Sequence, residues 1–408
     1  MGRRKEGAVA LPTDLKRKNY LSILNTFRSG KAMSANEVSE KTGISRQTVM
    51  KAVNHFMEKG LLSSAGKGES TEIGGKKPEL FQFDMERYLL CIGLSGNEMA
   101  VCLYDLTGRL VGKEEQEFRM EVSLEDFFYH IERMSEKLLN QAEKGRELLY
   151  GVSLFVVGVL ENGVLRHFAL LPEWGNDIPL KEMLEARFPN TEVVVENVAR
   201  MAACAAVLDN PEYEKRRVAV IYTDMGISAC YIDNSRVVRG ANGLIGEIGT
   251  MVLSLTEAKA YARDSRSYFS HLVGEKYLKE LAQADKALLK KSSLASYGEE
   301  LSIKDIFKEA EEGDPLAKEI VSKAAWSFSA AFYNVMLGFE PEVIIVQGNY
   351  AHAGTWFEQC VKKGIACFPG VSEEPFLMQY DKRPLMELQM MGATKLLMKH
   401  FFESSEWL

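Results

Sequence analysis

Residues 34–62 constrain the fold of this chain more than any other stretch, because they have the pattern of two short helices joined by a tight turn. Ser34 can cap the first helix, Gly43 can take the left-handed conformation of the turn, and Ser45 can cap the second helix. Apolar residues recur at helical spacing in the second helix and predict a buried face. These residues are Val49, Val53 and Phe56. Together the features predict a helix-turn-helix.

The opposite face of the second predicted helix carries hydroxyl, amide and basic side chains, which can reach base edges and phosphates in the DNA major groove. A Gly-rich segment with several lysines follows, and residues 80–83 then alternate like a strand. This pattern predicts a β-hairpin wing lying along a DNA backbone, although its lysines also fit a solvated loop. The predicted base-reading residues are Ser45, Arg46, Gln47 and Thr48, and the predicted phosphate contacts are Lys51, Lys67, Lys76 and Lys77.

The distribution of charged residues also separates residues 1–84 from the rest of the chain. Residues 1–84 hold 15 Lys and Arg against 9 Asp and Glu, a local net charge of +6, whereas the whole chain carries −7. A basic segment attracts the DNA polyanion, and an acidic remainder does not. We therefore expect residues 1–84 to form a winged helix-turn-helix domain that binds double-stranded DNA.

The remaining sequence is too long for a single ordinary core. From residue 88 onward, strand-like runs alternate with helical stretches, which predicts an α/β fold with mixed sheets. Two such sheets indicate two lobes around a cleft.

We expect a cytoplasmic protein with no membrane segment. No run of about eighteen apolar residues is present, and the N-terminus is charged without a long apolar segment. The six cysteines are scattered and form no Cys-x-x-Cys pair, which suits free thiols in a reducing cytosol.

Five segments carry motifs in a recognisable order. GGKKPELFQFD at residues 74–84 has a Gly-basic-basic-Pro pattern, and RGANGLIGEIGTMVL at residues 239–253 contains a Gly-Glu-Ile-Gly element. The other three segments are residues 170–206, 306–321 and 341–350. In this order they resemble the ROK family of sugar-responsive repressors and sugar kinases, over nearly the whole chain. The resemblance is to the xylose and N-acetylglucosamine repressor type, with a body similar to a degenerate sugar kinase.

The resemblance implies an α/β body of two actin-like (ribonuclease H-like) lobes with a sugar cleft between them. After the winged helix-turn-helix of residues 1–84, the first lobe is expected at residues 85–205, completed by a C-terminal helix at about 390–408. The second lobe is expected at residues 206–389.

Several departures from the family pattern argue against enzymatic activity. The family's catalytic base is the Asp of Glu-Asn-Asp, and Val198 occupies that position and cannot accept a proton. The first phosphate loop corresponds to residues 93–97 and lacks its Asp and Thr. The second corresponds to residues 224–228, where Asp224 and Met225 would repel and crowd a phosphate. We therefore expect a protein that is not an enzyme and has no catalytic residues.

The zinc site of the family is also missing from the sequence. Thr250 stands where the family has the His of Gly-Glu-Ile-Gly-His, and residues 251–359 contain no cysteine. Because a tetrahedral site needs about four ligands, no metal and no cofactor are predicted.

The resemblance also implies a set of sugar contacts. Asn197 and Glu247 would bond sugar hydroxyls, while the alternatives are a turn-forming Asn and a capping carboxylate. Leu170, Val198 and Thr250 replace three usual contacts, which predicts a narrowed, less polar or altered cleft. The full predicted ligand-binding set is Trp174, Glu196, Asn197, Asn242 and Glu247.

The sequence thus predicts a sequence-specific transcriptional regulator, a repressor of carbohydrate-related genes whose effector is a sugar or sugar phosphate. A homodimer, or a dimer of dimers, would bind a palindromic operator. The alternatives are a ligand-independent DNA-binding dimer with a scaffold body and an active sugar kinase with a regulatory head.

Overall fold

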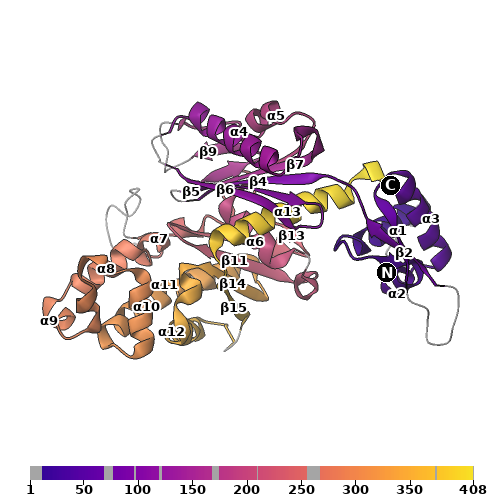
Figure 1. Cartoon of the computed structure of the whole chain (residues 1–408). Coiled ribbons are helices and arrows are strands. Elements are labelled where there is room, and N and C mark those ends of the chain that lie inside the picture. The colour runs from indigo at the N-terminus through magenta and orange to yellow at the C-terminus, as the bar shows by residue number, and fades with distance from the viewer. Residues whose placement is uncertain are drawn as a thin grey trace.

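The computed structural model has a small N-terminal head, residues 12–84, beside a larger two-lobed body (Figure 1). The structure describes residues 12–68, 77–95, 98–118, 122–167, 174–208, 210–254, 267–372 and 375–407. None of the helices in these ranges is both long and apolar enough to cross a bilayer.

Three helices and a small antiparallel sheet form the head. Ser34 caps α2 by a capping box in which its backbone N–H donates to Glu37 (2.7 Å), and Gly43 ends this helix at φ 69°. The apolar faces meet in a shared core where Val49 and Phe56 are fully buried. The elements are α1 (Pro12–Thr26), α2 (Ala35–Thr42), α3 (Arg46–Glu58), β1 (Met33–Ser34), β2 (Leu62–Lys67) and β3 (Glu79–Phe83), with strand order β1-β3-β2. The two helices predicted over residues 34–62 are confirmed.

The first lobe is built on a five-stranded mixed sheet of order β10-β7-β4-β5-β6. Strands β4, β5 and β6 form an antiparallel meander, and β7 and β10 continue the sheet in parallel. The strands are β4 (Tyr88–Ser95), β5 (Glu98–Asp105), β6 (Leu110–Glu117), β7 (Leu149–Val156) and β10 (Glu192–Asn197). Around them lie α4 (Leu124–Gln141), the hairpin β8 (Val159–Glu161) and β9 (Val164–His167), α5 (Leu180–Arg187) and α6 (Val198–Val207).

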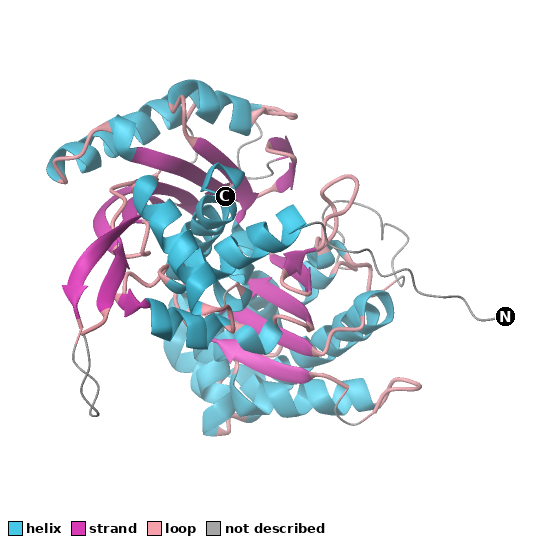
Figure 2. Ribbon diagram, turned by 90° about the vertical axis from the view of Figure 1, so that its right-hand side faces the viewer, coloured by secondary structure: helices cyan, strands magenta, loops and turns pink. Residues whose placement is uncertain are grey.

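The second lobe has a five-stranded sheet of order β13-β12-β11-β14-β15. Its strands are β11 (Arg217–Thr223), β12 (Ile227–Asp233), β13 (Arg236–Val237), β14 (Val343–Gly348) and β15 (Leu377–Asp381). Its helices are α7 (Phe269–Leu272), α8 (Glu275–Gln283), α9 (Lys286–Leu289), α10 (Ile303–Glu312), α11 (Pro315–Phe339) and α12 (Gly354–Ala366). Figure 2, which faces the head, shows the strands of the two lobes at different levels of the molecule. The alternation of strands and helices predicted from residue 88 onward is confirmed as an α/β fold with two sheets.

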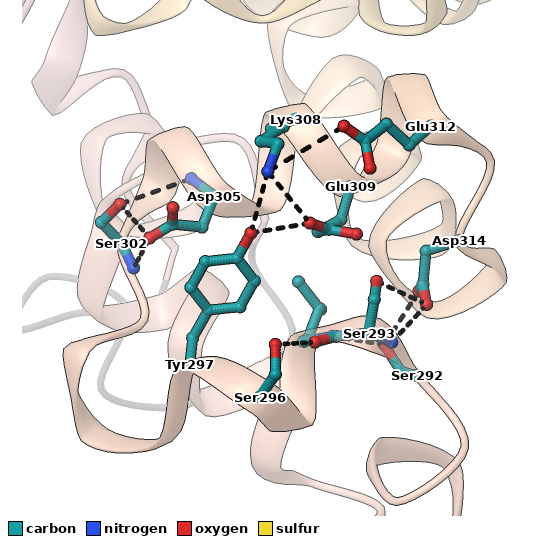
Figure 3. A network of polar contacts seen from close by, with 11 residues as sticks. Ser292, Ser293, Ser296, Tyr297, Ser302, Asp305, Lys308, Glu309, Glu312 and Asp314 are labelled. Atoms are coloured by element: carbon teal, nitrogen blue, oxygen red, sulfur yellow. Dashed lines mark hydrogen bonds and ion pairs between the residues drawn. The ribbon is translucent and has the colours of Figure 1, made fainter.

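A polar network fixes the beginning of α11 against the chain before α10 (Figure 3). Asp314 caps α11 by accepting from the Ala317 N–H (2.9 Å), and it also accepts from the Ser292 hydroxyl (2.9 Å). The Ser293 N–H donates to the same carboxylate (2.8 Å). These bonds hold the pKa of Asp314 below its usual value. The first turn of α11 is therefore firmly anchored in the second lobe.

Helix α13 (Leu385–Glu403) connects the body to the head (Figure 1). It packs closely on α6, where a Cβ at Gly392 would collide with the Met201 carbonyl. At its far end, the Phe402 ring lies 5.3 Å from Phe83 of β3. The Trp407 carbonyl lies 3.2 Å from a ring nitrogen of His55 on α3.

Candidate nucleic-acid interface and inter-lobe cleft

A groove of about 560 Å³ lies in the head between the first turn of α3 and the β2–β3 hairpin. Arg46 enters it from α3, Lys67 from the end of β2, and Lys77 from the residues before β3. One acid, Glu79, also lines the groove, and it accepts from the Ser64 hydroxyl (3.0 Å). The fold therefore gathers three predicted DNA contacts from separate segments into one concave, basic surface.

The other predicted DNA contacts divide into two groups. Gln47 and Lys51 are exposed on α3, and within the described residues neither makes a side-chain hydrogen bond or ion pair. Ser45 instead caps α3, accepting from the Thr48 N–H (3.3 Å), and the two hydroxyls lie 3.0 Å apart. Lys76 lies outside the described residues. The first turn of α3 thus presents free cationic and amide groups beside a satisfied cap.

A second cavity, of about 330 Å³, lies between the two lobes. The first lobe contributes residues 157–159, Asn197 and Val198, and the second contributes Tyr222, the loop of residues 224–228, and Glu247. Its walls are mainly apolar, and they include the buried Val198. Of the five predicted ligand-binding residues, Asn197 and Glu247 line this cavity.

The buried side chain of Glu196 is held in an ion-pair cluster. One carboxylate oxygen accepts from Arg200 Nε (2.5 Å) and the Asn197 N–H (2.9 Å), and the other accepts from Arg239. Arg200 in turn donates to the Leu160 carbonyl (2.9 Å). Both oxygens of this carboxylate are therefore occupied by the protein itself.

Asn197 is similarly engaged. Its side-chain oxygen accepts from the Ala199 N–H (2.8 Å) and caps α6, and its side-chain N–H₂ donates to the Gly158 carbonyl (2.7 Å). These bonds tie the end of β10 to the residues before β8. An incoming hydroxyl would have to share or displace them.

Trp174 and Asn242 do not line the inter-lobe cavity. The Trp174 indole donates to the Val122 carbonyl (2.8 Å), and its ring lies 4.9 Å from Phe127 in the first-lobe core. Asn242 is exposed.

Two carboxyl groups give the cavity its electrostatic character. Burial raises the pKa of Asp224, which lies on the loop after β11, and burial likewise raises the pKa of Glu247 against a smaller opposing effect of Arg200. A raised pKa means that the surroundings disfavour the charged form. A phosphate at this loop would meet a carboxylate and not the backbone N–H groups of an open glycine loop.

The structure describes only part of the two segments that correspond to the phosphate loops of a kinase. Gly96 and Asn97, in the segment that corresponds to the first phosphate loop, lie outside the described residues. Met225 is 68% exposed at the second loop. In the described part of the chain, no group of three or more His, Cys, Asp or Glu is placed to hold a metal ion.

Three residues at or beside the cleft were not identified from the sequence. Arg200 on α6 stands only four residues after Glu196, but Glu196 lies at the end of β10, so the helical spacing rule does not predict their pairing. Arg239 opens the RGANG motif, but nothing local connects it to Glu196. Tyr222 is a third such residue, because its role depends on the Gln389 side chain of α13 (3.0 Å).

The chain shares sequence and fold with several known proteins. The model of the ROK family matches residues 89–383. The xylose repressor of Bacillus spizizenii is 24% identical over 349 residues, 84% of this chain and 84% of that protein. A glucokinase of Halalkalibacterium halodurans is 24% identical over 284 residues, 68% of this chain and 85% of that protein. The crystal structure of a ROK family transcriptional regulator, a homologue of the Escherichia coli MLC protein, matches with a TM-score of 0.75 at 18% identity, covering 95% of this chain and 97% of its own.

Proposed function

The chain belongs to the ROK family, and from this premise we propose that it is a sequence-specific DNA-binding repressor of carbohydrate-related genes. Its two-sheet body matches the actin-like lobes of this family, and the likeness to a ROK regulator extends over the head as well. The xylose repressor covers similar shares of both chains, whereas the glucokinase covers less of this one. These relatives favour a regulator of sugar metabolism over an enzyme.

The basic groove of the head is the observation that carries the proposal. Arg46, Lys67 and Lys77 line it, and no described residue neutralises them by an ion pair. We propose that residues 1–84 are a winged helix-turn-helix, with α3 in the major groove and the β2–β3 hairpin as the wing. Ser45, Arg46, Gln47 and Thr48 would then read bases, and Lys51, Lys67, Lys76 and Lys77 would contact phosphates.

Two copies of the chain would place two α3 helices in successive major grooves of a palindromic operator, as a homodimer or a dimer of dimers. In this assembly, residues 85–205 with the C-terminal helix would be the first lobe and residues 206–389 the second. The protein would act in the cytoplasm, where the DNA is.

A sugar or sugar derivative in the inter-lobe cavity is the proposed effector, and α13 offers a route from that cavity to the head. Gln389 on α13 donates to the Tyr222 hydroxyl, which lines the cavity (3.0 Å). Phe402 at the other end of the same helix, and Trp407 four residues after its end, contact the head. A change in lobe closure would therefore move the surface on which the head rests.

A ligand-independent DNA-binding dimer is the second candidate, and the internal bonds of Glu196 and Asn197 favour it. Side chains that complete the fold are not free to recognise a sugar. A thermal-shift screen with hexoses, pentoses, amino sugars and their phosphates separates the two candidates. A rise in Tm with one sugar class supports the sensor, and an unresponsive protein supports the scaffold.

Kinase activity is not part of the proposal, because Val198 stands where the base is required. Incubation with ATP and sugars is expected to give no turnover above background. Sustained ADP formation with any sugar would contradict this expectation. It would indicate that the protein is a sugar kinase that also carries a DNA-binding head.

The DNA-binding proposal is tested with Arg46→Ala. Loss of a base contact is expected to weaken operator binding roughly tenfold to a hundredfold at fixed salt and to relax sequence preference at one position. Lys59→Ala is the matched control, since Lys59 is exposed at the opposite end of the same helix. If Arg46→Ala binds the operator with unchanged affinity and unchanged sequence preference, α3 is not the recognition helix.

A further inference from the structure

The outward face of α11 carries an apolar stripe that the described body leaves uncovered. Trp326 is 50% exposed and Leu337 is 70% exposed, which is unusual for large apolar side chains on one helix. Between them lie Ala330 and Tyr333, both partly exposed. The four residues follow the alternating spacing of four and three that places side chains along one seam of a helix.

This stripe is held rigidly. The opposite face of α11 is fixed in the second-lobe core by the fully buried Phe328 and Phe332. The Tyr333 ring stacks on Phe368, with centroids 4.4 Å apart and an angle of 6° between the ring planes. With its first turn anchored through Asp314, the helix presents the stripe at little cost in conformational entropy on binding.

Charged residues of opposite sign continue the same seam at both ends. Lys323 precedes Trp326 by three residues within α11, and Glu340 follows Leu337 by three as the C-cap residue, directly after the last helical residue Phe339. Both are exposed, and each has one surface ion pair in its own chain, Lys323 with Glu319 (2.8 Å) and Glu340 with Arg217 (3.0 Å). Such exposed pairs are weak enough to exchange partners.

The seam is complementary to itself when a second copy lies antiparallel on it. In that register Trp326 faces the partner's Leu337, and Ala330 faces the partner's Tyr333. Lys323 then meets the partner's Glu340 at each end of the contact. A two-fold axis repeats every contact, as an isologous interface requires.

We propose that two copies of this chain pair through α11, with its seam from Lys323 to Glu340 forming the core of the dimer interface. The inference deepens the proposed function, because it assigns a surface to the dimer that a palindromic operator calls for. The contact itself does not depend on DNA. Its occupant is a second copy because both the apolar and the charged positions match under the two-fold operation.

The first experiment measures the oligomeric state of the full-length protein without DNA by sedimentation velocity. The wild type is expected to be a dimer at micromolar concentration. Leu337→Arg places a charge against the partner's Trp326 and is expected to raise the dimer dissociation constant at least about thirtyfold. Leu288→Arg is the control, because Leu288 on α9 is similarly exposed (47%) and lies off the seam.

The second experiment exchanges the end charges. Lys323→Glu and Glu340→Lys are each expected to weaken the homodimer about threefold to tenfold, because each places like charges together at both ends. Mixed in equal amounts, the two variants are expected to form a heterodimer in preference to either homodimer, since both ion pairs are then restored. Lys279→Glu, which breaks the comparable Lys279–Glu275 pair on α8, is expected to leave dimerisation unchanged.

Thiol labelling gives an independent measurement. Of the six cysteines, Cys367 is exposed and stands next to Phe368, whereas the other five are buried. Its alkylation is expected to be slower in the wild-type dimer than in monomeric Leu337→Arg.

The outcomes separate this inference from the proposed function. A wild type that is monomeric, or a dimer that tolerates Leu337→Arg as well as it tolerates Leu288→Arg, overturns the α11 interface even if operator DNA is bound. If the wild type is a dimer and Leu337→Arg dissociates it, the result supports the interface even if no operator is found. In that case only the proposed DNA-binding function is contradicted.

Discussion

The head groove and the inter-lobe cavity both have polar side chains in or beside their walls, but these side chains are engaged differently. In the groove, the side chains of Arg46 and Lys67 extend from a folded core and make no hydrogen bond or ion pair with any described residue. In the cavity region, Glu196 and Asn197 form several bonds that hold β10, α6 and the residues around β8 together. The comparison teaches that polar groups near a cavity are available to a partner only where the fold does not already use them.

The two sites also differ in the sequence signal that points to them: the match to the family model covers residues 89–383 and so includes the cavity but not the head. Val198 gives the cavity an apolar wall, and internal hydrogen bonds already engage the side chain of Asn197. In the head, by contrast, Arg46, Lys67 and Lys77 meet at one groove.

Of the substitutions that test this comparison, Glu196→Gln is expected to have the largest effect. It leaves Arg200 buried with a neutral partner and should lower the free energy of unfolding by about 3 kcal/mol, measured by urea denaturation. Glu161→Gln, which breaks the more exposed pair with Arg166, should cost much less. Normal stability in Glu196→Gln together with reduced sugar binding would show that Glu196 serves the ligand more than the fold.

Lys67→Ala tests the other side of the comparison, with an intermediate effect. Because Lys67 is exposed, unfolding should not change, while operator affinity should fall several-fold for specific and nonspecific DNA alike. The slope of log affinity against log salt should decrease by about one unit. The measurement is a salt titration of binding, with Lys290→Ala on the body as the control. A destabilised head with an unchanged salt slope would place Lys67 among the structural residues.

Asp224→Asn is expected to have the smallest effect. The pKa of Asp224 is raised by burial, so the folded state binds the proton more tightly than the unfolded state, and stability falls as the pH rises through this range. Asparagine removes that penalty at neutral pH, and Tm should rise by about two degrees or less. The gain should disappear as the pH falls below the ordinary Asp pKa of 3.8, where the wild-type carboxyl becomes protonated in both states. A lower Tm at neutral pH would mean that the ionised carboxylate stabilises the cavity.

Much of the head could be predicted from sequence because its signals are local. The caps at Ser34 and Ser45 and the turn at Gly43 each depend on a few neighbouring residues. The pairing of Arg239 with Glu196 joins residues 43 apart and depends on how the lobes close, so no spacing rule predicts it. The outward seam of α11 is visible in the sequence as a helical periodicity, but only the fold shows that nothing in the described body covers it.

The contact between α13 and the head has a consequence for the order of events during synthesis. His55 and Trp407 are 352 residues apart, and α13 leaves the ribosome after the strands of both sheets. The head is small, its helices are locally specified, and it can fold while the body is still being made. Until α13 emerges, however, the head has no surface on the body against which to rest. A nascent chain therefore carries a head that is not yet under the influence of the lobes, and any control that they exert begins with the emergence of α13.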